Sequence, residues 1–431
     1  MSLGLNLLAH LSQPSPDPEQ LILQLEAWLQ RKYADMLPQT RRESTNSVPA
    51  LFCQLHPAAE EFELSLVGPA KLVASASTSV LGPGYHVFLC ELLRDLAHDF
   101  NGAWETPAAD SEEYLDETGF FFTGDEQGLR SEMTSWLAGI ARCFSPDGPL
   151  DLDDPKGTAL CLPINPQFED DHPARTPLGP RDRDWIERTA RDGNSGTDFF
   201  AWWMPGFNAE YYLRRALAHM WTNVRWRLPV NDSERSVLED TADSLRRAYG
   251  LDPNLQYPWA EWKQVLDLLN QESDETELVN SHAYGTPTIG YRRRSVTVTL
   301  PGRWSVKIPG SFSDCKLDEE GDFCTVDPPR EIWFSVYDLK GGPSPAVFES
   351  RKRSMQAARN PDYVVERENY FAQATISKKQ LNTGEEYSVL NSFNLTLGGQ
   401  LILTIVFPGP EQQDWAMETW RSIKPPSISE A

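Results

Sequence analysis

Residues 386–407 read EYSVLNSFNLTLGGQLILTIVF. Two runs of alternating, β-branched and aromatic residues, 386–397 and 400–407, lie on either side of Gly398-Gly399. Such runs separated by a pair of glycines are typical of a tight β-hairpin. This stretch therefore predicts an antiparallel sheet in the last third of the chain.

The neighbouring segments extend this sheet and flank it with helices. Strands are predicted at 295–300, 304–308, 331–337 and 364–376, and short helices at 348–359 and 414–423. Two motifs in this region, Gly302-Arg303-Trp304-Ser305-Val306-Lys307-Ile308-Pro309 and Trp420-Arg421-Ser422-Ile423, make the last third similar to the PsbP-like α/β/α sandwich. Photosystem extrinsic subunits, DcrB-like bacterial proteins and Eag-type secretion chaperones share that fold. The resemblance implies a module that binds other proteins rather than a catalyst.

The first two thirds of the chain mix the two kinds of pattern. Helical periodicity is found at 19–36, 85–100 and 126–144 and three more times within 208–269, where Asn231 is placed to cap the second helix. The segment 165–181 has no periodicity and is interpreted as an exposed loop. The chain as a whole is therefore predicted to be α+β, with strands at 48–55, 61–67, 71–77, 119–123, 158–164 and 197–204.

Charge divides the chain near residue 280. Of 39 basic and 63 acidic residues, only 17 and 18 lie in 281–431, so the segment 1–280 holds 22 basic and 45 acidic side chains. We expect an acidic domain over 1–275 with a sub-boundary between 165 and 195, a linker over 276–290, and a PsbP-like domain over 291–426. An anionic first domain argues against nucleic acid or anionic lipid as the partner, because both require a cationic surface.

Compartment signals favour the cytoplasm. The apolar stretch at the start of the sequence is neither preceded by a basic residue nor followed by a small-residue cleavage site, and no run is long enough to span a membrane. The six cysteines are scattered without a Cys-x-x-Cys pair, which is typical of thiols in a reducing environment.

No motif specifies a reaction or a cofactor. His86 and Cys90 stand four apart on a predicted helix and could face one metal, but the sequence offers no matching further ligand. The preferred interpretation is that His86 satisfies a backbone group and Cys90 belongs to the core. We therefore expect no catalytic residue, metal or cofactor.

Binding residues are expected of two kinds. An aromatic segment over 199–226 suggests an interface led by Trp221, Arg225 and Trp226, since Trp and Arg anchor protein interfaces. Acidic stretches suggest a surface for a cationic partner; its candidates are Asp110, Glu112, Glu113, Asp116, Asp151, Asp153 and Asp154, with the acidic residues of 169–171 beside them.

The leading hypothesis is a cytoplasmic protein-binding factor, most simply a bacterial immunity protein or a dedicated chaperone of a secreted toxin or effector. Its acidic domain would occlude a basic partner. Two other functions stay open: an enzyme of unrecognised class with a site near Tyr85 and His86, and a structural component of a larger assembly that uses the Trp-rich helices.

Overall fold

The computed structural model is of the α+β class that the sequence predicts. It describes residues 2–12, 17–36, 39–45, 48–106, 115–144, 160–161, 167–168, 172–270, 275–317, 322–338, 344–358, 360–380, 384 and 386–426. The chain forms two compact units. The first comprises 1–164, 170–224 and 236–290, and the second comprises 165–169, 225–235 and 291–431.

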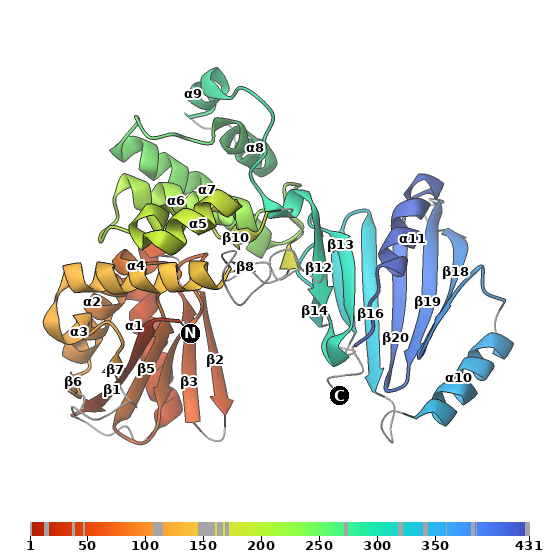
Figure 1. Ribbon diagram of the computed structural model, residues 1–431, viewed down its shortest axis with the longest axis horizontal. Coiled ribbons are helices and arrows are strands. Elements are labelled where there is room, and N and C mark those ends of the chain that lie inside the picture. Colours follow the sequence, from red (N-terminus) through yellow and green to blue (C-terminus); the bar gives the residue numbers. More distant parts are fainter. Residues whose placement is uncertain are drawn as a thin grey trace. The chain divides into compact units, whose positions relative to one another are not determined.

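An antiparallel sheet forms the base of the first unit (Figure 1). Its strands follow the order β2-β3-β4-β5-β1-β6, and β7 pairs with a further stretch of β1. The strand bounds are β1 Gly4–Leu11, β2 Gln39–Thr45, β3 Val48–Gln54, β4 Phe62–Leu66, β5 Lys71–Ser77, β6 Gly102–Trp104 and β7 Leu115–Asp116. The predicted strands at 48–55, 61–67 and 71–77 are thereby confirmed.

Helices α1 (Pro18–Lys32) and α2 (Pro83–Asp99) pack on the apolar face of this sheet. Asp17 caps α1 by accepting hydrogen bonds from the backbone N–H groups of Glu19 and Gln20. Both helices bury leucine-rich faces against strand residues such as Leu64 and Ala74. This layer is the core of the first unit.

The remaining helices of the first unit with eight or more residues are stacked beyond one end of the sheet (Figure 1). They are α4 Glu126–Cys143, α5 Arg183–Arg191, α6 Ala209–Thr222, α7 Asp232–Leu251, α8 Trp259–Leu269 and α9 Glu275–His282. The predicted cap of α7 is confirmed, since Glu234 N–H donates to Asn231 Oδ1 at 2.9 Å. Part of the segment predicted to be a linker is helix α9, and Thr288 and Ile289 beyond it donate backbone hydrogen bonds to Glu261.

Two predicted strands are wrong. Residues 119–123 form a single helical turn, α3 (Phe120–Thr123), because Gly119 and Gly124 at its two ends adopt left-handed backbone conformations. The second, 197–204, is a 3₁₀ turn (Gly193–Phe199) followed by irregular backbone, although Phe199, Phe200 and Trp202 are buried as expected.

One prediction near residue 170 requires correction, and another is confirmed in part. The segment expected to be an exposed loop contains the hairpin of β10 (Ala174–Thr176) and β11 (Gly179–Arg181), in which Ala174 and Thr176 are buried. Of the strand predicted at 158–164, the structure shows β8 (Leu160–Cys161), and the rest lies outside the described residues.

The second unit is built on a seven-stranded antiparallel sheet in the order β14-β15-β16-β20-β19-β18-β17. Its bounds are β14 Lys316–Leu317, β15 Phe323–Asp327, β16 Arg330–Asp338, β17 Tyr363–Arg367, β18 Tyr370–Gln380, β19 Glu386–Thr396 and β20 Gly399–Phe407. The β19–β20 hairpin is the predicted one. The strand predicted at 364–376 is instead two strands, because the chain turns at Asn369, which has a φ of 56°.

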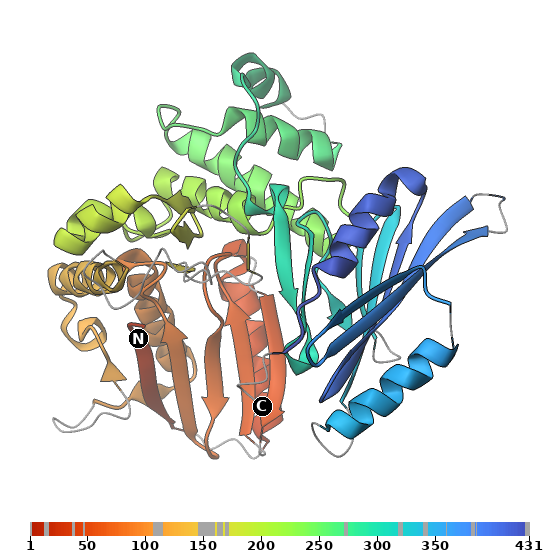
Figure 2. The same cartoon turned by 45° about the vertical axis from the view of Figure 1, so that its right-hand side comes forward.

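Helices lie against both faces of this sheet (Figure 2). On one face, Phe348 of α10 (Pro345–Ala358) packs with Phe371 and Leu395. On the other, Trp420 of α11 (Gln413–Arg421) donates a hydrogen bond to Asn394. Because adjacent residues of a strand point to opposite faces, Asn394 and Leu395 place the two helices on opposite sides. A smaller sheet of β9 (Gln167–Phe168), β12 (Ser295–Thr299) and β13 (Ser305–Pro309) completes the unit.

Within the described residues, none of the helices has both the length and the apolar character needed to cross a bilayer.

Candidate functional site

The most distinctive polar cluster is buried at the N-terminal end of α2. A sharp turn leads into this helix, because Gly82 has a φ of 101° and Gly84 lies directly against Trp202. A Cβ added at Gly84 would come within 2.4 Å of the Trp202 ring. The glycines of the Gly-Pro-Gly turn are therefore explained by close packing against the buried aromatic segment at Trp202.

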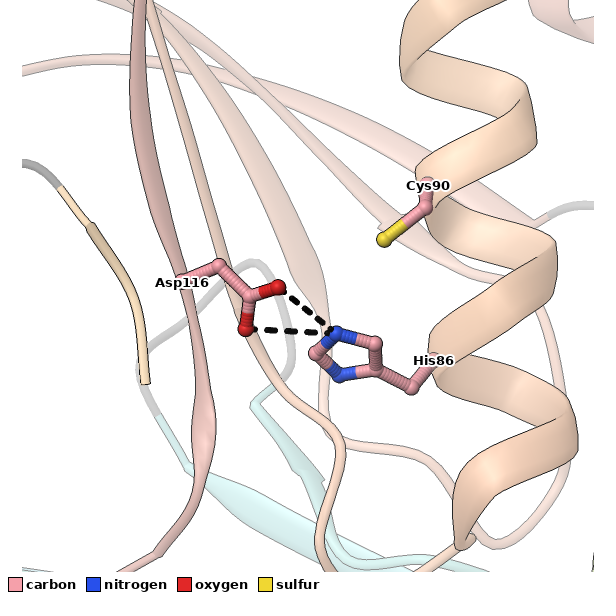
Figure 3. Close-up of side chains that lie close together, drawn as sticks. All are labelled: His86, Cys90 and Asp116. Atoms are coloured by element: carbon pink, nitrogen blue, oxygen red, sulfur yellow. Dashed lines mark hydrogen bonds and ion pairs between the residues drawn. The ribbon is translucent and has the colours of Figure 1, made fainter. Parts of the chain in front are cut away.

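His86 projects from the first turn of α2, and one of its ring nitrogens faces Asp116 (Figure 3). A hydrogen bond of 2.9 Å joins Nδ1 to the hydroxyl of Thr78. On the other side, Nε2 lies 3.3 Å from both carboxylate oxygens of Asp116 and 3.1 Å from the hydroxyl of Thr118. His86 thus satisfies side chains rather than the backbone group that we expected.

Asp116 is held by its own loop as well as by the histidine. Its carboxylate accepts hydrogen bonds from the backbone N–H of Phe121 at 2.6 Å and from that of Thr118 at 2.9 Å. Burial acts to raise the pKa of Asp116, but the interaction with His86 and then the hydrogen bonds from the Phe121 N–H and the Thr118 hydroxyl outweigh it and lower that pKa. Asp116 is therefore an anion fixed in the interior.

Cys90 stands one helical turn after His86 and faces the same group. One ligand-type atom from each of His86, Cys90 and Asp116 lies within 4.8 Å of the others, and all three residues are buried. Burial, with the nearby charge of Asp116, raises the pKa of the Cys90 thiol well above its usual range. The group is closed to solvent, so a substrate could not reach His86 or the equally buried Tyr85 in this conformation.

The three residues expected to lead the interface of the aromatic segment are buried or half-buried. Trp221 is half-buried in the first unit, and its ring would contact any Cβ added at Gly179. Arg225 is only 6% exposed and forms an ion pair with Asp314 inside the second unit. Trp226 is half-buried beneath the Arg293 guanidinium, which lies 3.7 Å from its ring centre. The contacts of Arg225 and Trp226 therefore stabilise the second unit internally.

Of the acidic residues predicted to bind a cationic partner, one is buried and the others lie outside the described residues. Asp116 was expected on the surface, but it is 6% exposed and faces His86, because the pairing of β7 with β1 places it against α2. Asp110, Glu112, Glu113, Asp151, Asp153 and Asp154 lie outside the described residues, as do residues 169–171.

A concave acidic face that we did not predict lies on the side of the first sheet opposite α1 and α2. It encloses about 620 Å³ and is lined by Glu60, Glu61, Glu63 and Glu117 around a floor that includes Phe52. The strand register places Phe52 opposite Glu63, and Glu63 opposite Ser75. The signal for this face was present in the alternation of Phe62-Glu63-Leu64-Ser65-Leu66, in which every second residue is polar.

A second cavity of about 480 Å³ lies beside α6 and α7 and is lined by Tyr211, Arg215 and Asp240 among others. Asp240 accepts hydrogen bonds from Arg215 and pairs with His219 Nε2 at 2.8 Å. Burial acts to raise the pKa of Asp240, but His219 and Arg215 hold it well below its usual range. The positive charge of Arg215 and the negative charge of Asp240 compensate each other, as is typical of buried ion pairs that belong to the fold rather than to a binding site.

Comparison with known proteins identifies no family. No family model matches the chain, and no curated protein matches it. Three chains among the solved structures match, one of them in a crystal structure of a protein from Bacteroides thetaiotaomicron VPI-5482 at 1.50 Å resolution. That match has 15% identity and a TM-score of 0.25, and it covers 31% of this chain and 49% of that one. The chain thus spans about half the length of that protein, and so low a TM-score carries no argument about fold or function.

Proposed function

We propose that the protein binds a protein partner with a basic surface and acts as an immunity protein or a dedicated chaperone for it. The observation that carries the proposal is the distribution of charge. The segment 1–280 holds 45 acidic and 22 basic side chains, whereas 281–431 holds 18 and 17. Such a field attracts a cationic partner and speeds its association.

The concave face of the first sheet supports this proposal. Its glutamates would meet Lys or Arg side chains, and the Phe52 ring offers an aromatic surface, on which the Arg41 guanidinium already lies 4.0 Å from the ring centre. The hydrogen bond from Arg41 lowers the pKa of Glu61, so this carboxylate stays ionised through the physiological range.

The second unit is proposed to contact the partner in a different way from the acidic first unit. It is nearly neutral, and its resemblance to PsbP-like proteins implies a protein-binding module. In the proposed arrangement it is the docking module for a further surface of the same complex, while the acidic unit occludes the basic region of the partner.

The test is binding to the protein captured from the chain's own cells, measured at about 50 and 300 mM salt. We expect a basic partner whose affinity falls by at least about tenfold at the higher salt, because the Debye length shortens and exposed charges are screened. Replacing four glutamates of the concave face (E60Q, E61Q, E63Q and E117Q) is expected to weaken binding at low salt by about tenfold or more.

The matched control replaces four glutamates elsewhere in the first unit (E19Q, E91Q, E132Q and E239Q), all of them exposed. It removes the same charge and is expected to change affinity by less than about threefold, since surface charges away from the contact are screened. Capture of a partner without a basic surface would sink the proposal. Salt-resistant binding that is lost on Trp221→Ala would favour a structural component of an assembly instead.

A further inference from the structure

The cluster of His86, Cys90 and Asp116 has the composition of a metal site. It presents one imidazole nitrogen, one sulfur and one carboxylate oxygen, all within 4.8 Å of one another and all buried (Figure 3). His86 and Cys90 are four positions apart on α2 and therefore share a helix face. Asp116 comes from β7, a strand that follows α2 and β6 along the chain.

The distances between His86 and Asp116 fit a shared cation. Nε2 lies 3.3 Å from each carboxylate oxygen, whereas a single charge-assisted N–H···O bond is typically about 2.7–2.9 Å long and directed at one oxygen. Two donor atoms about 2.0–2.1 Å from a zinc ion at the tetrahedral angle are about 3.3 Å apart. The sulfur lies within 4.8 Å of the other two atoms, whereas sulfur and nitrogen ligands of one tetrahedral zinc are about 3.6 Å apart, so the separation would shorten by up to about 1.2 Å.

Other side chains already orient these ligands. Thr78 holds Nδ1 of His86, which directs Nε2 toward Asp116. The backbone N–H groups of Thr118 and Phe121 fix the carboxylate. Such outer hydrogen bonds, which set the histidine ring and the carboxylate in place, are characteristic of zinc sites in proteins.

We propose that His86, Cys90 and Asp116 bind one divalent ion of the zinc class, with the Thr118 hydroxyl or a water as the fourth ligand. Nitrogen and sulfur donors favour zinc over magnesium or calcium, which take oxygen ligands. Because the group is closed to solvent, the ion is structural: it joins helix α2 to strand β7 across the first unit. The site is independent of the partner-binding function proposed above.

Binding the ion requires the Cys90 thiol to lose its proton. The ligand is a thiolate and not a thiol, so zinc binding releases one proton, which passes to the buffer.

The experiment measures the metal content of the full chain purified from zinc-supplemented cells, and its melting temperature with and without a chelator. We expect one zinc per chain and a lower melting temperature once the ion is removed. Replacing zinc by cobalt(II) is expected to give a thiolate-to-metal absorption band in the near ultraviolet. This band tests cysteine ligation in the unaltered protein, so it does not depend on any variant folding.

Cys90→Ala is expected to lose the stoichiometric zinc and the cobalt band, with an affinity lower by more than about 100-fold, since outer-shell changes alone cost about 10–100-fold. The matched control is Cys53→Ala, which removes another buried thiol of the same unit and is expected to keep both. The proposal is overturned if the wild-type chain holds no zinc and its melting temperature is unaffected by the chelator. It is equally overturned if Cys90→Ala retains the metal.

Discussion

His56 shows how a buried residue couples stability to pH. Its Nδ1 accepts a hydrogen bond from the backbone N–H of Ala58, and the ring is 1% exposed. Burial and then the nearby charges of Arg215 and His219 lower its pKa well below the ordinary value, against a smaller opposite effect of Asp240. His56 is therefore neutral in the folded protein but takes up a proton in the unfolded chain below about pH 6.5.

The sign of the effect follows from this difference. A histidine whose pKa is lower in the folded than in the unfolded state contributes to the free energy of unfolding. This contribution is complete above the unfolded-state pKa and is lost as pH falls toward the folded-state pKa. Between about pH 7.5 and 5.5 we expect His56 to account for a loss of about 1.4 kcal/mol in the free energy of unfolding. Urea titrations should show this loss in the wild type and not in His56→Asn, in which the amide oxygen can replace Nδ1 as acceptor. The exposed His98→Asn control should retain the loss, and an equal loss in His56→Asn would refute the assignment.

At the scale of elements, sequence patterns predict best where alternation or helical periodicity is long. The hairpin of 386–407 follows directly from its alternation, and α4 follows from its helical periodicity. Short aromatic runs mislead, because a short apolar run fits a strand, a turn or a buried irregular segment equally well. Trp202 N–H bonds to the carbonyl of Leu81, so the 197–204 segment packs on the turn before α2 instead of joining a sheet.

Helix α10 rests on a small cluster of its own. Phe348 packs with Phe371 and Leu395, and Met355 and Leu397 border the cluster. Truncating Phe348 to Ala removes the main apolar contact of the helix, and we expect a cost of about 3 kcal/mol in the free energy of unfolding of the second unit. Chemical denaturation measures this cost, and Val347→Ala, at a 36%-exposed neighbour, is expected to cost less than about 0.5 kcal/mol. Equal effects of the two substitutions would mean that the packing of α10 contributes little.

At the scale of the whole molecule, the candidate sites show where sequence analysis stops. His86 and Cys90 could be paired from their spacing on one helix, but Asp116 joins them only because β7 pairs with β1, which the sequence does not show. The same pairing buries Asp116, which the sequence places in an acidic surface stretch. Net charge, in contrast, is additive and can be read from the sequence without a fold.

That charge has a consequence for the stability of the whole chain. With a formal net charge of −24, repulsion among carboxylates opposes the compact state. Raising salt from about 10 to 300 mM shortens the Debye length from about 30 Å to less than about 10 Å. We therefore expect the midpoint of thermal unfolding to rise with sodium chloride, and to rise less in the variant that carries the four glutamine substitutions of the concave face. A midpoint that falls with salt would show that attractive pairs such as Arg215–Asp240 outweigh the repulsion. The acidic surface would then not destabilise the free protein, and a basic partner could not stabilise it by neutralising that charge.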